Sequence, residues 1–202
     1  MPEIKSALRE RERIPLSYYL QEDVVALSRD LLGKILCAQD KRGGERRLLI
    51  TETEAYRAPE DRASHAYNYR RTRRNESMFQ MGGTAYVYIC YGIHHLFNIV
   101  THREEVPHAI LIRSGICLAD GQLVSGPGKL TQYMKIDKRD DGTSLINGRI
   151  WLEQGEKIKD GSITASPRIG ISYAREWAAV PWRFILSHPL VSKSSDFSLT
   201  YS

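Results

Sequence analysis

The sequence contains little cysteine and no paired cysteine motif. Only three of its 202 residues are cysteines, Cys37, Cys90 and Cys117, and each lies within an apolar stretch. Domains that depend on disulfides place many more cysteines in shorter chains. We therefore expect three buried free thiols and a protein of a reducing compartment.

Long apolar runs are also missing. No stretch approaches the ~20 consecutive apolar residues that a membrane-spanning helix needs. The segment from Arg9 to Arg13 alternates arginine with glutamate, which is too charged for the apolar centre of a signal peptide. We expect a cytoplasmic protein that does not associate with a membrane.

The common metal and nucleotide motifs are absent. The sequence has no Cys-x-x-Cys and no His-Glu-x-x-His spacing, and its glycine clusters at 82–83 and 126–128 match neither a dinucleotide fingerprint nor a P-loop. Four histidines could offer metal ligands, but the adjacent pair would point to opposite faces of a strand; they are His94, His95, His102 and His108. We expect no metal and no cofactor.

Acidic residues are outnumbered by basic ones. The chain has 29 Lys and Arg against 24 Asp and Glu, which gives a net charge of +5. Four of the arginines fall between Tyr67 and Asn75, beside aromatic residues. Such a cluster suits contact with phosphates, because guanidinium groups bind phosphate oxygens and tyrosines can stack on bases. The alternative is a hydrated surface loop.

The remaining pattern predicts one domain. We divide the chain into a solvated N-terminal arm (1–14), a single domain (15–192) and a C-terminal tail (193–202) that we do not assign. Helices are expected over 18–32, ending at Gly33, and after Gly126-Pro127-Gly128, including Leu130, Met134 and Ile136. Residues 60–65 should form a loop or short helix. Strands are expected at 34–38, 48–56, 85–90, 93–100, 108–114, 150–152 and 169–173. Short strands joined by tight turns favour an α+β fold with a mostly antiparallel β-sheet flanked by helices.

Two carboxylates end the second predicted strand. A regular strand would place Ile50, Glu52, Glu54 and Tyr56 on one face. Two buried carboxylates there would require cationic partners. One of them could be a general base while the other is held by an arginine or by backbone donors. The alternative is a solvated strand face.

The tyrosines near the predicted hairpin invite two interpretations. Tyr86 and Tyr88 share one strand face and could belong to the core or form a stacking surface. Tyr91 precedes the turn residue Gly92, so its ring either packs locally or is exposed for a partner. Asn98 lies between Phe97 and Ile99 and needs hydrogen-bond partners if it is buried. It could be a structural amide or a group that reads a ligand.

Taken together, these residues resemble the alkyladenine (3-methyladenine) DNA glycosylase family. The resemblance covers about residues 24–190, with the motifs in family order. It rests on Leu31–Leu36 (LLGKIL), Glu52–Tyr56 (ETEAY), Pro59-Glu60-Asp61 with His65, Met78-Phe79, Gly83–Gly92 (GTAYVYICYG), Asn98-Ile99, Leu111–Arg113 (LIR), Ser125–Leu130 (SGPGKL), Arg168–Ile171 (RIGI) and Glu176-Trp177 through Pro181 to Arg183-Phe184.

The resemblance implies roles for the residues of a base-binding pocket. Glu54 would be the general base that activates the attacking water, and Arg113 would help to position that water. Tyr56, His65 and Tyr88 would line the pocket that receives a flipped base, and Asn98 would discriminate against normal purines. The family uses no metal and no cofactor, and its fold is one mixed domain around a curved antiparallel sheet.

The resemblance also implies a DNA-binding surface. Tyr91 would enter the duplex and fill the space left by the extruded nucleotide. Further predicted contacts with DNA are Arg70, Arg71, Thr72, Met78, Ile93 and Lys129. The chain departs from some relatives at Arg70–Arg74 and at His94-His95. The expected partner is double-stranded DNA containing damaged purines, bound by a monomer that would be nucleoid-associated in a bacterium.

The chemistry suits these residues. A base inside a duplex must leave the stack before an enzyme can reach it, and N-alkylation makes a purine cationic and a good leaving group. Two other functions remain open, a metal-dependent nuclease using Glu52, Glu54 and Asp61, and a non-catalytic module that binds nucleic acid. The proposed role of Glu54 requires that its carboxylate be neither sealed in the interior nor turned away from an aromatic-lined cavity.

Overall fold

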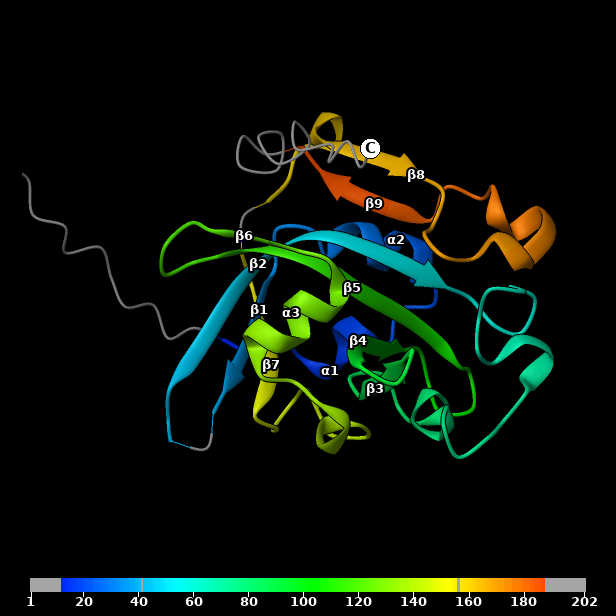
Figure 1. The fold of residues 1–202 in the computed structure, drawn as a ribbon, viewed down its shortest axis with the longest axis horizontal. Coiled ribbons are helices and arrows are strands. Elements are labelled where there is room, and N and C mark those ends of the chain that lie inside the picture. The colour runs from blue at the N-terminus through cyan, green and yellow to red at the C-terminus, as the bar shows by residue number, and fades with distance from the viewer. Residues whose placement is uncertain (1–11, 41, 156, 188–202) are drawn as a thin grey trace, which may run out of the picture.

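Nine strands form one sheet in the computed structural model, which describes residues 12–40, 42–155 and 157–187 (Figure 1). Every pairing between these strands is antiparallel. The prediction of a single α+β domain is confirmed. The strands are β1 (Ile35–Gln39), β2 (Glu45–Tyr56), β3 (Ala85–Cys90), β4 (His94–Thr101), β5 (His108–Cys117), β6 (Leu123–Ser125), β7 (Ile150–Glu153), β8 (Ile163–Ser166) and β9 (Arg183–Leu186).

The main path of the sheet runs β3-β4-β5-β2-β1-β7. The short strand β6 pairs with β5, while β9 pairs with β2 and carries β8 on its other side. The long strands β2 and β5 therefore lie at the centre, and they run side by side in Figure 1. All ten residues of β5 are buried, which fits its central position.

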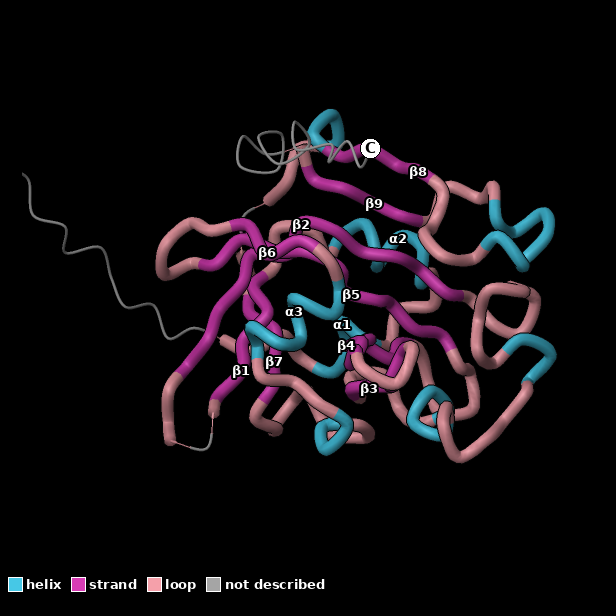
Figure 2. Tube along the Cα trace, in the orientation of Figure 1, coloured by secondary structure: helices cyan, strands magenta, loops and turns pink. Residues whose placement is uncertain are grey.

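Short helices surround the sheet (Figure 2). The α-helix α2 packs against β2 and β5, and α3 packs against β4, β5 and β6. The helices are α1 (Leu16–Tyr19), α2 (Val24–Asp30) and α3 (Pro127–Met134), with 3-10 helices η1 (Tyr67–Tyr69), η2 (Glu76–Phe79), η3 (Lys138–Asp140), η4 (Asp160–Ser162) and η5 (Ser172–Ala178). Among the described residues, no helix has the length and apolar character that crossing a membrane requires.

Several predicted elements need correction. The predicted helix 18–32 is two helices, because Asp23 caps α2 by accepting hydrogen bonds from the amides of Val25 and Ala26. The second predicted helix ends at Met134, before Ile136. The predicted strand 169–173 is a loop followed by η5. The Ile169 amide, at the start of this segment, donates to the Glu54 carboxylate and not to a neighbouring strand. Strands β6, β8 and β9 were not predicted.

The strand β2 changes partner at an irregularity near its middle. Residues 45–49 pair with β1, whereas residues 52–54 pair with β9. The register against β5 shifts between Ile50 and Thr53, opposite Gly115. A Cβ atom on Gly115 would lie 2.8 Å from the carbonyl oxygen of Leu49, so only glycine fits this close approach. Despite the shift, Glu52 and Glu54 still face the same side, because both contact Arg113.

The described part of the predicted N-terminal arm is packed on the domain. Ile14 is buried, and its amide donates to the Leu152 carbonyl. The Arg13 guanidinium donates to the carbonyls of Ile146 and Gly148. These two residues therefore belong to the folded domain. The rest of the arm before Glu12, the last five residues predicted for the domain and the C-terminal tail lie outside the described residues.

Candidate active site

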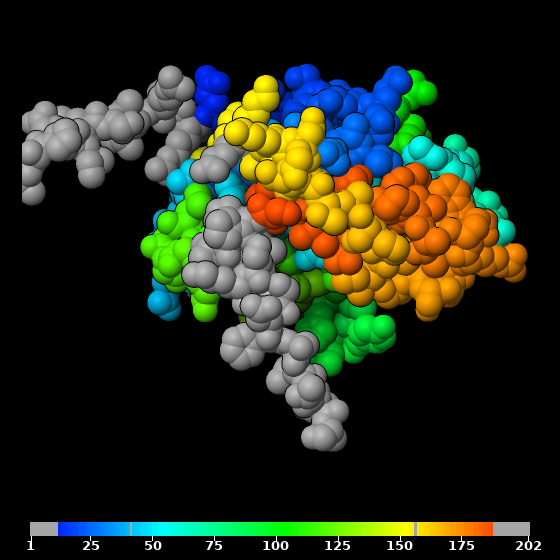
Figure 3. All heavy atoms as spheres, turned by 90° about the horizontal axis from the view of Figure 1, so that it is seen from above, coloured from blue at the N-terminus to red at the C-terminus, as the bar shows by residue number. Residues whose placement is uncertain are grey.

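A cavity of about 710 Å³ opens at one end of the sheet. Its walls come from β3, the hairpin after it, the ends of β4 and β5, the start of α3 and the segment 169–173. The segment 169–173 lies at one end of the molecule, within the orange region of Figure 3. The volume lies within the range of pockets that hold small-molecule ligands.

The carboxylate of Glu54 lies behind this wall. Its side chain has no exposed surface. One oxygen, Oε2, accepts a hydrogen bond from the Tyr56 hydroxyl at 2.8 Å. The other, Oε1, accepts from the Ile169 amide at 2.8 Å and lies 3.3 Å from the Arg113 guanidinium. All three partners line the cavity, but Glu54 itself does not, so the carboxylate lies one hydrogen bond behind the cavity surface and the expectation that it faces the cavity is not met.

Glu52 is held by two arginines. Its carboxylate accepts from Arg113 at 3.0 Å, from Arg183 at 3.1 Å and from the Ser114 hydroxyl at 2.7 Å. Arg113 thus bridges Glu52 and Glu54, which supplies the cationic partner that two carboxylates on one strand face require. Glu52 has a structural role here, and Arg183 from β9 is a site residue that the sequence patterns did not single out.

Aromatic residues from two strands line the cavity. Tyr56 comes from the end of β2, and Tyr86 and Tyr88 come from β3. His65 lies in the loop after β2, where its Nδ1 is 2.7 Å from the Tyr86 hydroxyl and its ring centroid is 4.7 Å from that of Tyr88. The structure thus brings Tyr56, His65 and Tyr88 to one cavity, as predicted. Tyr86 is both a buried core residue and part of the wall.

Burial sets the protonation states in this wall. Burial, with Arg74 and Arg70 nearby, lowers the pKa of His65 to about 4, so the ring is neutral at pH 7. Burial and the Glu54 carboxylate raise the pKa of Tyr56 well above its ordinary value, so its hydroxyl stays protonated and donates to Glu54. The wall therefore presents neutral rings to a ligand at neutral pH.

Asn98 lines the cavity from β4. Its side-chain amide donates to the Tyr86 carbonyl at 3.1 Å. Asn98 is 3% exposed, so its side-chain amide needs hydrogen-bond partners inside the protein. The bond to the Tyr86 carbonyl satisfies one of its donors and holds the side chain in a single orientation. The two interpretations of Asn98, a structural amide and a group that reads a ligand, are therefore compatible.

The hairpin between β3 and β4 projects beside the cavity mouth. Tyr91 and Gly92 both have positive φ values, 50° and 74°, which the turn requires. The Tyr91 side chain is 90% exposed although it lines the cavity. Ile93, also at the tip, is 74% exposed. An exposed aromatic and an exposed aliphatic residue at one tip form a surface suited to an apolar or stacked partner.

The arginines between Tyr67 and Asn75 have different surroundings in the structure. Arg70 and Thr72 line a second, smaller pocket of about 280 Å³ that also includes His65 and Arg74. The Arg71 guanidinium instead binds the carboxylates of Glu76 and Glu105. Its charge is therefore already compensated. Within the described residues, the Arg70 side chain makes no ion pair or hydrogen bond, so it is available for an anion.

Two further residues that were predicted to contact DNA differ in their exposure. Lys129 is exposed at the start of α3 and lines the cavity mouth. Met78 also lines the cavity but is only 1% exposed, in a cluster with Phe79 and Tyr86. Met78 therefore shapes the cavity from below, where a duplex outside the protein would not reach it.

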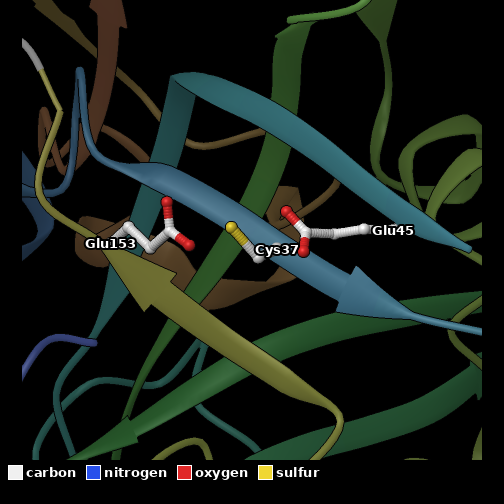
Figure 4. A group of neighbouring side chains, drawn as sticks. All are labelled: Cys37, Glu45 and Glu153. Carbon is white, nitrogen blue, oxygen red and sulfur yellow. The ribbon is translucent and has the colours of Figure 1, made fainter. Parts of the chain in front are cut away.

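One group in the described residues brings three possible metal ligands close together, the Cys37 thiol and the carboxylates of Glu45 and Glu153 (Figure 4). The Cys37 thiol lies between the carboxylates of strands β2 and β7. Arg47 forms ion pairs with both glutamates, and Trp151 donates to Glu153 at 3.0 Å. Burial raises the pKa of Cys37 to about 12, so the thiol is protonated. Arg47 already pairs with both carboxylates and would have to be displaced by a metal ion, which disfavours a metal at this group.

The segment 169–171 lines the cavity although no role was predicted for its residues. Ile169, Gly170 and Ile171 line it, together with Tyr173. Their motif was noted only as part of the resemblance and was expected to form a strand. The sequence held one signal against a strand, Gly170, because glycine is common at turns. In the structure its φ is 76°, which suits a turn better than a regular strand.

Most of the chain is similar to known proteins. A family model described as "Methylpurine-DNA glycosylase (MPG)" matches residues 18–189. A protein of Chlamydia felis (strain Fe/C-56) is 43% identical over 190 residues, which cover 86% of this chain and 96% of the relative. A Chlamydia pneumoniae protein is 44% identical over 84% of this chain and 93% of the relative. A Bacillus cereus (strain B4264) protein is 39% identical over 89% and 98%. All three are named "Putative 3-methyladenine DNA glycosylase".

Proposed function

Since the chain belongs to the methylpurine-DNA glycosylase family, we propose that the cavity beside Glu54 receives an alkylated purine flipped out of duplex DNA. The protein is an N-glycosylase of the DNA-3-methyladenine class, an enzyme of base excision repair. The mechanism proposed below assigns that activity to particular residues, and its product is an abasic site.

One observation supports this mechanism above the others. Several aromatic and imidazole rings line a cavity whose wall is hydrogen-bonded from behind to a carboxylate, Glu54. Neutral, electron-rich rings attract a cationic purine through cation–π interactions. A carboxylate close to the same cavity is the group that a hydrolytic glycosylase needs on the far side of the sugar.

DNA binding begins at the exposed surface. Arg70 and Lys129 contact phosphates of the damaged duplex, and the Tyr91 ring enters the stack where the nucleotide has left. Unstacking a base costs a few kcal/mol, and an inserted aromatic ring recovers part of that cost. Asn98 then tests the edge of the flipped base, and a purine that clashes with it is not held.

The chemical step breaks the bond between C1′ of the sugar and the purine nitrogen. The electron pair of that bond moves to the purine and cancels its positive charge, while the sugar develops oxocarbenium character. Water attacks C1′ from the opposite face and transfers its proton to Glu54. Arg113, 3.3 Å from Glu54, keeps this carboxylate oriented during the attack.

The burial of Glu54 adds a requirement to this mechanism. Because the carboxylate has no exposed surface, water reaches Oε2 only after Tyr56, Arg113 or Ile169 moves. Oε2 accepts one hydrogen bond, from Tyr56, and its second lone pair is the acceptor for that water. We place this small opening at the step in which the base enters, as a movement of the Ile169 segment that leaves the Tyr56 ring in place. A purely structural role, in which Glu54 only holds its three partners, is the alternative.

The activity is tested by incubating the protein with methylated duplex DNA in excess EDTA. The expected products are free alkylated bases and intact strands with abasic sites. Chromatography of the released bases also determines the lesion preference among 3-methyladenine, 7-methylguanine, hypoxanthine and ethenoadenine. Strand breaks that disappear in EDTA would instead identify a metal-dependent nuclease that uses Glu52, Glu54 and Asp61. Binding without release of any base would identify a non-catalytic module.

A further inference from the structure

A stack of alternating rings and guanidinium groups extends from the cavity wall, through the buried Arg168, to the partly exposed Arg57. The Arg168 guanidinium carbon lies 4.7 Å from the centroid of the Tyr56 ring and 5.3 Å from that of Trp182. On Trp182 lies a second guanidinium, that of Arg57, at 4.8 Å. The order is therefore Tyr56, Arg168, Trp182, Arg57. Cation–π contacts of this kind hold each ring in place.

Each guanidinium in this stack has its own carboxylate. Arg168 binds Asp61 with two hydrogen bonds, of 2.5 and 2.9 Å, and neither side chain has exposed surface. Arg57 binds Glu60 at 2.5 Å, at a more exposed position. The two acids are adjacent in the loop after β2, so one loop neutralises both cations.

Arg168 approaches Tyr56 from the side away from the cavity. Tyr56 lines the cavity, whereas the Arg168 side chain is fully buried and does not line it. Arg168 is also fixed by donating to the Ala55 carbonyl at 2.8 Å. A base stacked on the cavity face of Tyr56 would therefore have Arg168 behind the same ring.

We propose that the Asp61–Arg168 pair sets the charge preference of the cavity for the flipped base. This inference rests on the proposed function. Arg168 supports the Tyr56 ring, and Asp61 cancels the guanidinium charge that would otherwise repel a cationic purine through the ring. Both are positioning residues, since neither touches the base. The substrate class they favour is the cationic N-alkylpurine over a neutral damaged purine of the same shape.

The two members of the pair have opposite effects on this preference. Removing the Asp61 charge leaves a buried cation behind Tyr56, which weakens binding of a cationic base relative to a neutral one. Removing the Arg168 charge leaves a buried anion and does the reverse. Charges separated by one ring and a stacking distance interact strongly enough in a protein interior to change relative affinity by about tenfold. A pair that only stabilises the fold would affect both bases alike.

The test compares two duplexes that differ in the charge of one base. One carries 7-methylguanine, which is cationic, and the other carries 7-deaza-7-methylguanine, its neutral isostere. Both have a 2′-fluoro sugar, which disfavours positive charge at C1′ and prevents cleavage. Fluorescence anisotropy gives Kd for each duplex, and the ratio Kd(neutral)/Kd(cationic) measures the preference. For Asp61→Asn this ratio falls about tenfold, for Arg168→Gln it rises, and for the double variant it returns towards the parent value.

Three results overturn the inference. They are an unchanged ratio in both single variants, a change of the same sign in both, and a double variant that does not recover. Circular dichroism checks that each variant folds, and Arg168→Gln carries the test if Asp61→Asn does not. The matched control is Asp160→Asn, which breaks the exposed pair with Arg29 and should leave the ratio unchanged. A parent that binds neither duplex better than undamaged DNA would overturn the proposed function as well.

Discussion

The buried wall around Glu54 and the hairpin tip around Tyr91 border the same cavity but are built differently. Glu54 has no exposed surface and its two oxygens have three partners, whereas Tyr91 is 90% exposed. The wall is held by Arg113, Arg168 and the irregular middle of β2. The tip is held by a turn with two residues at positive φ.

This difference separates two tasks. Catalytic groups must keep their orientation, and buried ion pairs with several hydrogen bonds restrict their motion. A surface that enters a duplex must be free of internal partners before DNA arrives. The contrast predicts that changes in the wall impair chemistry and stability, whereas removal of an exposed side chain at the tip impairs binding alone.

The largest expected effect is that of Glu54→Gln. The glutamine keeps the size of the side chain and an oxygen that can accept from the Ile169 amide, but it cannot take a proton from water. We expect base release to fall by about 10²–10⁴-fold, the usual contribution of a general base. Single-turnover release of alkylated bases measures this. Unchanged turnover would show that Glu54 is structural only, whereas loss of both turnover and binding to damaged duplex would indicate a misfolded wall.

A pair of glycine substitutions compares the stability of the two regions. Gly115→Ala places a Cβ 2.8 Å from the Leu49 carbonyl oxygen, so we expect a loss of about 1–3 kcal/mol in the free energy of unfolding. Gly92→Ala meets no atom within 4 Å, and only its φ of 74° opposes it, at a cost of about 1 kcal/mol. Urea unfolding measures both. Equal losses would contradict the distinction between a tightly packed wall and an open tip.

Tyr91→Ala should act on binding without affecting stability. Loss of one base–aromatic stacking contact corresponds to about tenfold weaker binding of a duplex with a stable abasic-site mimic. The melting temperature should not change, because the ring is exposed. Anisotropy and thermal unfolding measure the two effects. Equal affinity of parent and variant would remove the wedge role from Tyr91.

The smallest expected effect distinguishes two neighbouring arginines. Arg70→Ala should weaken DNA binding a few-fold and reduce the slope of log Kd against log salt by about one, because one phosphate contact is lost. Arg71→Ala is the matched control, since Arg71 is already paired with Glu76 and Glu105. Titrations at several salt concentrations measure both slopes. A larger change for Arg71 would show that DNA displaces its carboxylate partners.

Much of the site was predictable from sequence patterns. Alternation along a strand placed Glu52 and Glu54 on one side and required a cation, and that cation is Arg113. Tyr91 before Gly92 left two interpretations open, local packing or exposure for a partner, and the ring is exposed. The burial of Glu54 was not predictable, because its cover comes from Ile169 and Tyr56, and Ile169 is distant along the chain.

The sequence by itself determined the local features of this protein: the period of its strands, the turns at its glycines, the net positive charge and the motifs of its family. Only the tertiary structure decided which charges are compensated. Arg71 meets two glutamates while Arg70 meets none in the described residues, and Arg168 finds Asp61 across more than a hundred residues. The physical reason is that Coulomb energy and desolvation depend on distance and burial in space, which the order of residues along a chain does not contain.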